Sequence, residues 1–395
     1  MKILVCGCGR IGSPMLTWIA YNNIGKDDVE VSGVDVDKNI LGPLTPRFKE
    51  ESWEEYHEAL QKAEQVPVIL GYHDLHQPYD VVVVTCGTPI DNNQNPDTSQ
   101  VFSAIDALAN AGAITDDTLL VMRSTLFPGC SRLIRKRIAL HFGIFPQIVM
   151  APERIAEGNT FSEITRIPQI IGGDTEAGMR QAGRFFSKYF GSESLVYINP
   201  EDGGTVGAEL AKLMSNTYRY VNFAMGNEFA IICDENEVDF KAVRNACNYN
   251  YWRSDIAGAA LNLGGPCLGK DAKTLAAFTK NAKITEAAYE VAEKTAMYFV
   301  DKHRDVLRNG IAGILGLGFK ANSDNPMNSL SYKVKKQLEI LGAEVTVHDP
   351  RIHNTAPYTQ SPQWIINHCD VVFVMTEHDE YKNLQFRDDQ IVVRL

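Results

Sequence analysis

Short apolar runs alternate with helical stretches along the first 200 residues, and this alternation predicts an α/β fold. The run DVVVVT at Asp80–Thr85 is almost entirely β-branched, which is typical of a strand buried on both faces of a parallel sheet. Four similar runs predict strands at Lys2–Cys6, Val29–Val34, Leu119–Arg123 and Gln147–Ala151. The first of them precedes a helical stretch at Pro14–Tyr21.

The pattern of apolar positions changes at about Pro200. From Thr205 to Glu235 apolar residues recur at helical spacing, which predicts one long helix. After a glycine-rich loop, the stretch from Asp271 to about Asn309 is mostly Ala, Lys, Glu and Leu and predicts further helix. The middle of the chain is therefore expected to be helical.

The final third of the chain returns to alternating strands and helices. Strands are predicted at Gly310–Leu315, Ala343–Val347 and Asp370–Met375, with a helix at Ser329–Leu341. We therefore predict two Rossmann-like doubly wound domains joined by a central helical domain with a long helix. The predicted domain boundaries are 1–199, 200–309 and 310–395.

Composition and charge exclude several classes of protein. A content of 45% hydrophobic and 22% charged residues is ordinary for a globular enzyme. No apolar run approaches the ~20 residues of a membrane span, and the first residues predict a strand rather than a signal peptide. The net charge of −11 argues against nucleic-acid binding, so local cations must hold any anionic substrate.

The eight cysteines favour a reducing compartment. They are scattered without zinc-finger spacing, and Cys6 and Cys8 form only a C-x-C inside a glycine turn, so no metal site is expected. Unpaired thiols in a chain of this length indicate a cytoplasmic protein.

A glycine motif between the first predicted strand and helix predicts a dinucleotide site. Its first glycine makes a tight turn, its second admits a pyrophosphate, and its third lets the helix pack on the strand. Asp35 ends the next strand, 23 residues after the last glycine, where a carboxylate hydrogen-bonds the adenosine ribose and repels a 2′-phosphate. A plain glycine turn is the alternative, but strand, helix and acid all fall at the expected spacing, so NAD is favoured over NADP. The motif is Gly7-Cys8-Gly9-Arg10-Ile11-Gly12.

Polar residues follow three of the predicted strands. Thr88 lies in the turn after Asp80–Thr85, Thr125 follows the next strand, and Glu153 follows the strand after that. Turn chemistry explains each residue taken alone. Because the carboxyl ends of parallel strands share one edge, where ligands bind, we expect Thr125 and Glu153 to face the same crevice and the Thr88 loop to lie at this edge.

Three polar residues share one face of the long helix. Glu209, Lys212 and Asn216 are separated by three and four residues. A Glu–Lys pair on a helix is normally solvated and contributes little to stability. Lys212 and Asn216 adjoin the apolar stripe, so we expect these two side chains to face inward.

The stretch LGGPCLGKD at 263–271 contains a candidate nucleophile, Cys267. Glycines such as Gly264 let a substrate approach the sulfur closely. Lys270 and Asp271 follow within four residues, and a neighbouring ammonium favours the nucleophilic thiolate. A buried structural cysteine is the ordinary alternative.

A succession of motifs along nearly the whole chain resembles one family, the nucleotide-sugar 6-dehydrogenases that act on UDP-glucose and UDP-N-acetylhexosamines. The PERIAEG and NYNYWR stretches look most like the N-acetylhexosamine branch, and the KD after the cysteine looks more like the UDP-glucose branch. The motifs are GCGRIG, VTCGTP, RSTLFPG, APERIAEG, AELAKLMSNTYR, GGPCLGKD, GLGFKANSD and VHDP.

This resemblance implies a four-electron oxidation of the sugar's primary alcohol to a carboxylate, with two NAD+ as oxidants. Cys267 is expected to capture the aldehyde as a thiohemiacetal, which a second oxidation converts to a thioester that water cleaves. Lys212 and Asn216 are expected to stabilise the oxyanion, and Asp271 to act with a water as general base. Glu153 and Thr125 are expected to position the hydrolytic water.

The resemblance also implies the binding residues and the assembly. NAD is expected to bind to the glycine motif, which includes Arg10 and Ile11, and to Asp35, Thr88 and Thr125. The residues expected to bind the sugar are Glu153, Lys212, Asn216 and Gly264. Glu157 is expected to hold the loop that contains Glu153. Lys320 is expected to contact the UDP-sugar. Arg253 is a candidate for reaching the partner subunit's site in a homodimer paired through the long helix.

Some residues depart from the family pattern. Met327 stands where the family commonly has an arginine that contacts the cofactor, and the segment 259–263 replaces much of a glycine-rich loop. The floor of the sugar pocket is therefore expected to differ.

Two other functions remain open. One is a two-electron β-hydroxyacid-type dehydrogenase, which also pairs a helical lysine with an asparagine and does not need Cys267. The other is a non-catalytic nucleotide-sugar binding protein, favoured by the missing arginine.

Overall fold

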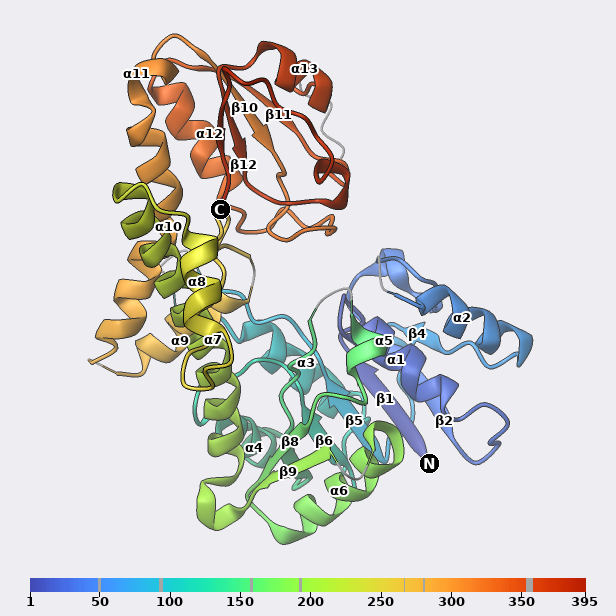
Figure 1. The fold of residues 1–395 in the computed structure, drawn as a ribbon. Coiled ribbons are helices and arrows are strands. Elements are labelled where there is room, and N and C mark those ends of the chain that lie inside the picture. Colours follow the sequence, from blue (N-terminus) through green and yellow to red (C-terminus); the bar gives the residue numbers. More distant parts are fainter. Residues whose placement is uncertain are drawn as a thin grey trace. The chain divides into compact units, whose positions relative to one another are not determined.

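The structure is a computed structural model of the chain, and it divides into two compact units, Met1–Met214 and Ser215–Leu395 (Figure 1). Each unit contains a mainly parallel sheet, which confirms the prediction of two Rossmann-like domains with a long helix. The three-domain boundaries remain a prediction. The residues described are 1–48, 51–91, 95–156, 159–191, 194–265, 267–279, 281–352 and 358–395.

A twisted sheet forms the centre of the first unit. Across its described residues, nine strands follow the order β3-β4-β2-β1-β5-β6-β7-β8-β9. All neighbours are parallel except β3 with β4 and β7 with β8. Strand order reverses between β1 and β5, and ligands bind at such a reversal. The strands are β1 Lys2–Cys6, β2 Glu30–Val34, β3 Gly42–Pro43, β4 Val68–Leu70, β5 Val81–Val84, β6 Leu119–Met122, β7 Gln147–Met150, β8 Gln169–Gly173 and β9 Leu195–Ile198.

Helices cover both faces of this sheet. Alternate strand residues such as Val5 and Val83 pack with α1 and α6, and their neighbours such as Leu4 and Val82 pack with α3 and α4. This two-sided burial explains why the predicted strands are continuously apolar. The helices are α1 Gly12–Tyr21, α2 Trp53–Lys62, α3 Ser99–Asn110, α4 Cys130–Phe142, α5 Thr160–Glu163 and α6 Glu176–Phe190.

The long helix α7 spans Gly204–Glu235, one residue longer than predicted, and passes from the first unit into the second. Glu209 on α7 is fully buried, so the expectation that it forms a solvated surface pair with Lys212 is wrong. Its carboxylate accepts hydrogen bonds from the backbone N–H groups of Gly129 at 2.6 Å and Ser131 at 2.7 Å, and from the Ser131 hydroxyl at 2.6 Å. Unpaired N–H groups at the start of α4 thus take a carboxylate as their acceptor.

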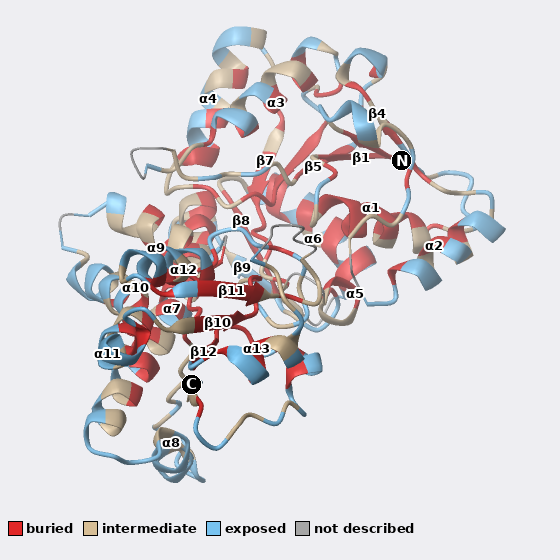
Figure 2. Ribbon diagram, turned by 90° about the horizontal axis from the view of Figure 1, so that it is seen from above, coloured by how far each residue is buried: buried red, intermediate tan, exposed pale blue. Residues whose placement is uncertain are grey.

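The second unit combines helices with a smaller parallel sheet of order β11-β10-β12-β13. Helices α10 and α12 pack on one face of this sheet, and α13 packs on the other. Figure 2 shows the strands buried, whereas α8 has no buried residue. The elements are α8 Phe240–Asn248, α9 Leu268–Ala277, α10 Lys283–Lys302, α11 Arg304–Leu307, β10 Ile311–Leu315, α12 Ser331–Ile340, β11 Glu344–His348, α13 Pro362–His368, β12 Val371–Val374 and β13 Ile391–Val393.

Replacing Glu209 by alanine should lower the free energy of unfolding by ~2–4 kcal/mol, because three donors, two of them buried on Ser131, lose their carboxylate acceptor. Urea unfolding followed by circular dichroism measures the change. The matched control is Glu201→Ala, since Glu201 is exposed just before the same helix, and it should leave the midpoint unchanged. Equal midpoints for the two variants would contradict the assigned anchor.

Candidate functional site

The glycine motif forms a tight turn at the strand-order reversal. Gly7 has φ +92°, a conformation that favours glycine, and a Cβ at Gly12 would lie 1.9 Å from the Gly7 carbonyl oxygen. The turn borders a cavity of about 590 Å³ that Asp35, Cys86 and residues of α3 also line. The close helix–strand approach and the open turn fit a dinucleotide.

Asp35 holds this turn as well as facing the cavity. Its Oδ2 accepts a hydrogen bond from the Cys8 N–H at 2.6 Å, and its Oδ1 accepts one from the Asp37 N–H at 2.9 Å. Each carboxylate oxygen can accept a second hydrogen bond, so capacity remains for a ribose hydroxyl.

Arg47 is a turn residue that sequence reasoning missed. Its Nη2 donates to the Cys8 carbonyl at 3.0 Å and to the Ser13 hydroxyl at 2.7 Å. Arg10 of the motif stacks on the Phe48 ring, with 4.9 Å between its guanidinium carbon and the ring centre. Two guanidinium groups thus flank the turn that would receive a pyrophosphate.

Thr88, Thr125 and Glu153 follow β5, β6 and β7, as expected. Both threonines are half-buried, and Glu153 is buried. Because these strands are parallel neighbours, the three residues follow strand ends at the same edge of the sheet as the glycine turn.

Glu153 forms a buried ion pair with Arg123, a residue that the sequence did not single out. Its Oε2 accepts hydrogen bonds from Nε, at 3.2 Å, and Nη2 of Arg123, and its Oε1 accepts from the N–H groups of Arg154 at 2.8 Å and Ile155 at 2.9 Å. Burial alone would raise the pKa of Glu153, but the Arg123 charge and these bonds outweigh it and lower the pKa. Glu153 is therefore ionised, and four donors occupy its acceptor positions.

The second unit gathers the cysteine, aspartate and asparagine of the expected catalytic set. Cys267 is exposed and lies at the N-cap of α9, and its carbonyl accepts the Asp271 N–H at 2.9 Å. Asp271 is buried, and its Oδ2 accepts a hydrogen bond from Asn216 Nδ2 at 2.6 Å. The Lys270 ammonium lies 3.2 Å from Oδ1, which accepts no hydrogen bond from the described residues. The Cys267 thiol therefore lies at the N-terminus of a helix, where the helix dipole favours negative charge.

Two polar residues of α7, Lys212 and Asn216, lie as the sequence predicts. Lys212 is half-buried and Asn216 is buried, so both face inward on α7.

The altered segment before the cysteine is anchored by Asn262, which sequence reasoning also missed. Asn262 Nδ2 donates to the Gly318 carbonyl at 2.9 Å and lies 3.1 Å from the Thr376 hydroxyl, and its Oδ1 accepts the Leu330 N–H at 2.8 Å. A Cβ at Gly264 would lie 2.4 Å from the Asn328 carbonyl oxygen. The cysteine loop therefore packs directly on the loops that follow β10.

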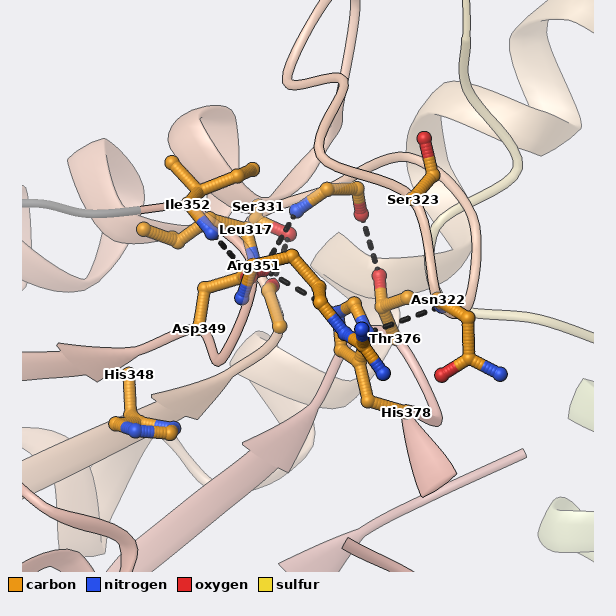
Figure 3. Close-up of polar contacts among 12 residues, drawn as sticks. Leu317, Asn322, Ser323, Ser331, His348, Asp349, Arg351, Ile352, Thr376 and His378 are labelled. Atoms are coloured by element: carbon orange, nitrogen blue, oxygen red, sulfur yellow. Dashed lines mark hydrogen bonds and ion pairs between the residues drawn. The ribbon is translucent and has the colours of Figure 1, made fainter. Parts of the chain in front are cut away.

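A second polar centre lies at the carboxyl ends of the C-terminal strands (Figure 3). Asp349 Oδ2 accepts the N–H groups of Leu317 at 2.6 Å and Gly318 at 2.9 Å, and lies 3.3 Å from Nε2 of the buried His378. His378 Nδ1 accepts the Asn322 N–H at 3.0 Å, so the Nε2–H faces Asp349. Burial would raise the pKa of Asp349, but the neighbouring His378 and the hydrogen bonds from backbone N–H groups lower it well below its usual range.

The other residues expected to contact the substrate are exposed or lie outside the described residues. Lys320 is exposed between the Gly318 turn and Asn322. Arg253 is exposed and stacks on Trp252, with its guanidinium carbon 4.4 Å from the ring centre. Glu157 lies outside the described residues.

Three family models of the UDP-glucose/GDP-mannose dehydrogenases match the chain. Residues 1–189 match the NAD-binding domain, 206–296 the central domain and 313–393 the UDP-binding domain. A UDP-N-acetyl-D-mannosamine dehydrogenase of Methanococcus maripaludis is 30% identical, over 100% of this chain and 90% of the relative. A second enzyme of that name, from Methanocaldococcus jannaschii, is 26% identical over 98% and 88%.

Solved structures share the fold. A UDP-glucose dehydrogenase from Pyrobaculum islandicum superposes with a TM-score of 0.85 at 24% identity, covering 100% of this chain and 94% of that one. A UDP-D-ManNAc dehydrogenase from Pyrococcus horikoshii gives 0.84 at 24% identity, over 98% and 91%.

Replacing Asp349 by asparagine should destabilise the protein near pH 7 by ~1–3 kcal/mol, because buried donors lose their charged acceptor. Since the pKa of Asp349 is lowered by folding, its stabilisation is present above about pH 4, the unfolded value, and is lost as pH falls. The gap in urea midpoint between wild type and variant should therefore narrow below pH 4. The exposed Asp388→Asn is the matched control, and a gap independent of pH would refute the assignment.

Proposed function

Because the chain belongs to the UDP-glucose/GDP-mannose dehydrogenase family, we propose that it oxidises the primary alcohol of a UDP-linked sugar to a carboxylate with NAD+. The observation that carries this proposal is the cluster in which Asn216 and Lys270 flank the buried Asp271, one helical turn from the exposed Cys267. A two-electron dehydrogenase would not need this cysteine.

The first substrate to consider is a UDP-N-acetylhexosamine. The two relatives above are named for UDP-N-acetyl-D-mannosamine, and the C-terminal residues match a UDP-binding domain. UDP-glucose is the alternative, because the Lys270–Asp271 pair resembles that branch.

Cys267 acts as the covalent nucleophile. NAD+, when bound, accepts a hydride in each of the two oxidations. The Cys267 thiolate adds to the aldehyde carbon to give a thiohemiacetal, and after the second oxidation water cleaves the thioester and regenerates the thiol. Overall, one alcohol, two NAD+ and one water give one carboxylate, two NADH and three protons.

Asn216 and Lys212 stabilise the oxyanion, and Asp271 handles protons. One Nδ2 hydrogen of Asn216 is used by Asp271, which leaves the other for substrate oxygen. Lys212 lies one turn away on the same helix. The Oδ1 of Asp271, which accepts no hydrogen bond within the described residues, is the oxygen that a catalytic water would reach.

The four donors around Glu153 change the role first expected for it. With its acceptor positions filled, we assign Glu153 the task of shaping the turn after β7, and Thr125 the task of orienting the hydrolytic water. Lys320 and Gly264 belong to the loops that would hold the UDP-sugar, and for Glu157 we keep the role expected from the family resemblance, which is to hold its own loop.

The cysteines bear on localisation. All eight cysteines are free thiols, which supports our proposal of a cytoplasmic protein. Within the described residues, none of the helices combines the length and apolarity that a membrane span needs.

Cys267→Ala should abolish carboxylate formation and leave NAD binding intact, since the glycine turn lies in the other unit. Wild type should release two NADH per sugar in a panel of UDP-N-acetylmannosamine, UDP-N-acetylglucosamine, UDP-N-acetylgalactosamine and UDP-glucose. The control is Cys247→Ala, because Cys247 is exposed on α8. One NADH per sugar, or carboxylate from Cys267→Ala at a near wild-type rate, would overturn the covalent mechanism.

We also propose a homodimer paired through α7. Met214, Tyr218, Met225 and Ile232 recur at intervals of four and seven residues and are 44–65% exposed. Such a stripe is a helix-pairing surface. The aromatic residues Phe223 and Phe229 of the same helix are half-buried.

Sedimentation should give twice the 43.9 kDa chain mass, and Tyr218→Asp with Met225→Asp should halve it. The matched control is Leu140→Asp, which places the same charge on an exposed leucine of α4.

Arg253→Ala should raise KM for the UDP-sugar more than for NAD if Arg253 completes the partner subunit's site. A fully active monomer at nanomolar concentration would exclude both ideas.

A further inference from the structure

Two thiols lie together next to the cavity at the glycine turn, and one of them lines this cavity. Cys6 is the last residue of β1, and Cys86 is half-buried two residues after β5 and lines the cavity. Their sulfur atoms are 3.8 Å apart. The Cys6 sulfur also lies 3.1 Å from the hydroxyl of Tyr72, another residue that lines the cavity.

The backbone brings these thiols within reach of a disulfide. Strands β1 and β5 are parallel neighbours in which Cys6 pairs with Val84. A Cβ on the adjoining Gly7 would lie 3.1 Å from the Cys86 Cα, so the two chain segments touch at this point. An S–S bond is about 2.05 Å long, and rotating the two side chains has to close a gap of roughly 2 Å.

We propose that Cys6 and Cys86 form an oxidation site for peroxide, and that their disulfide lowers the affinity for NAD. The Cys86 thiol reacts with hydrogen peroxide to give a sulfenic acid and water. The Cys6 sulfur then attacks that sulfur, an S–S bond forms and a second water leaves. Two thiols are oxidised by two electrons, and one peroxide is reduced to two waters.

The surroundings of the two thiols decide the order of these steps. Cys86 faces the cavity, which admits peroxide, whereas Cys6 is fully buried. Its hydrogen bond with Cys86 and its burial raise the pKa of Cys6, so Cys86 rather than Cys6 is the thiol that peroxide oxidises first. Cys8 packs in the core on the opposite face of the sheet and is excluded from the pair.

The effect on NAD follows from what the bond would move. Joining the sulfurs removes the contact of Cys6 with Tyr72 and pulls the turn at Cys86 toward β1, and both Tyr72 and Cys86 line the cavity. Bound NAD would in turn cover Cys86 and shield it from peroxide.

The test uses full-length protein carrying Cys267→Ala, so that the catalytic thiol cannot contribute. After treatment with hydrogen peroxide, peptide mass mapping without reductant should find Cys6 joined to Cys86. Calorimetry should show NAD affinity reduced by about tenfold, with dithiothreitol restoring it. NAD present during oxidation should slow the cross-link, and a UDP-sugar should not.

Matched variants separate this site from general oxidation. Adding Cys6→Ala or Cys86→Ala should make NAD affinity insensitive to the peroxide–dithiothreitol cycle, whereas adding Cys233→Ala, another half-buried thiol, should preserve the response. The proposal fails if no Cys6–Cys86 peptide forms, if the cross-linked protein binds NAD as before, or if the Cys6→Ala protein loses NAD binding reversibly too.

Discussion

The continuity of helix α7 is the constraint on which the rest of the structure depends. The helical backbone fixes the spacing and the direction of three side chains, those of Glu209, Lys212 and Asn216. Glu209 is bound to the start of α4 in the first unit, and Asn216 is bound to Asp271 in the second. One helix therefore contributes an anchor to the first unit and a hydrogen-bond partner of Asp271 to the second.

The site residues are held by buried carboxylates, each matched to donors of a different kind. Glu153 is paired with a guanidinium, Asp349 with a histidine and backbone N–H groups, and Asp271 with an amide and an ammonium. Burying a carboxylate is costly unless donors compensate it. We therefore assign Glu153 and Asp349 a structural role, and we propose that Asp271, whose Oδ1 accepts no hydrogen bond within the described residues, transfers protons.

The cysteine loop depends on the C-terminal sheet for its shape. Asn262 is buried among the loops after β10 and β12, and Gly264 touches the backbone of Asn328. A change at the predicted UDP-binding loops would therefore shift the backbone that leads to Cys267. This coupling gives the altered segment before the cysteine a structural purpose that its departure from the family pattern did not suggest.

Local patterns in the sequence were enough to predict both sheets, the long helix, the glycine turn with Asp35, and the inward face at Lys212 and Asn216. These features follow from periodicity and spacing over a few residues, which the backbone geometry of strands and helices enforces. The partners of the site were not predictable in this way. Arg123 meets Glu153 across 30 positions, Asn262 meets Thr376 across 114, and Cys6 meets Cys86 across 80. Only the strand order of the sheets and the packing of loops on them decide such pairs, because a hydrogen bond or sulfur contact depends on distance in space and leaves no periodic signal along the chain.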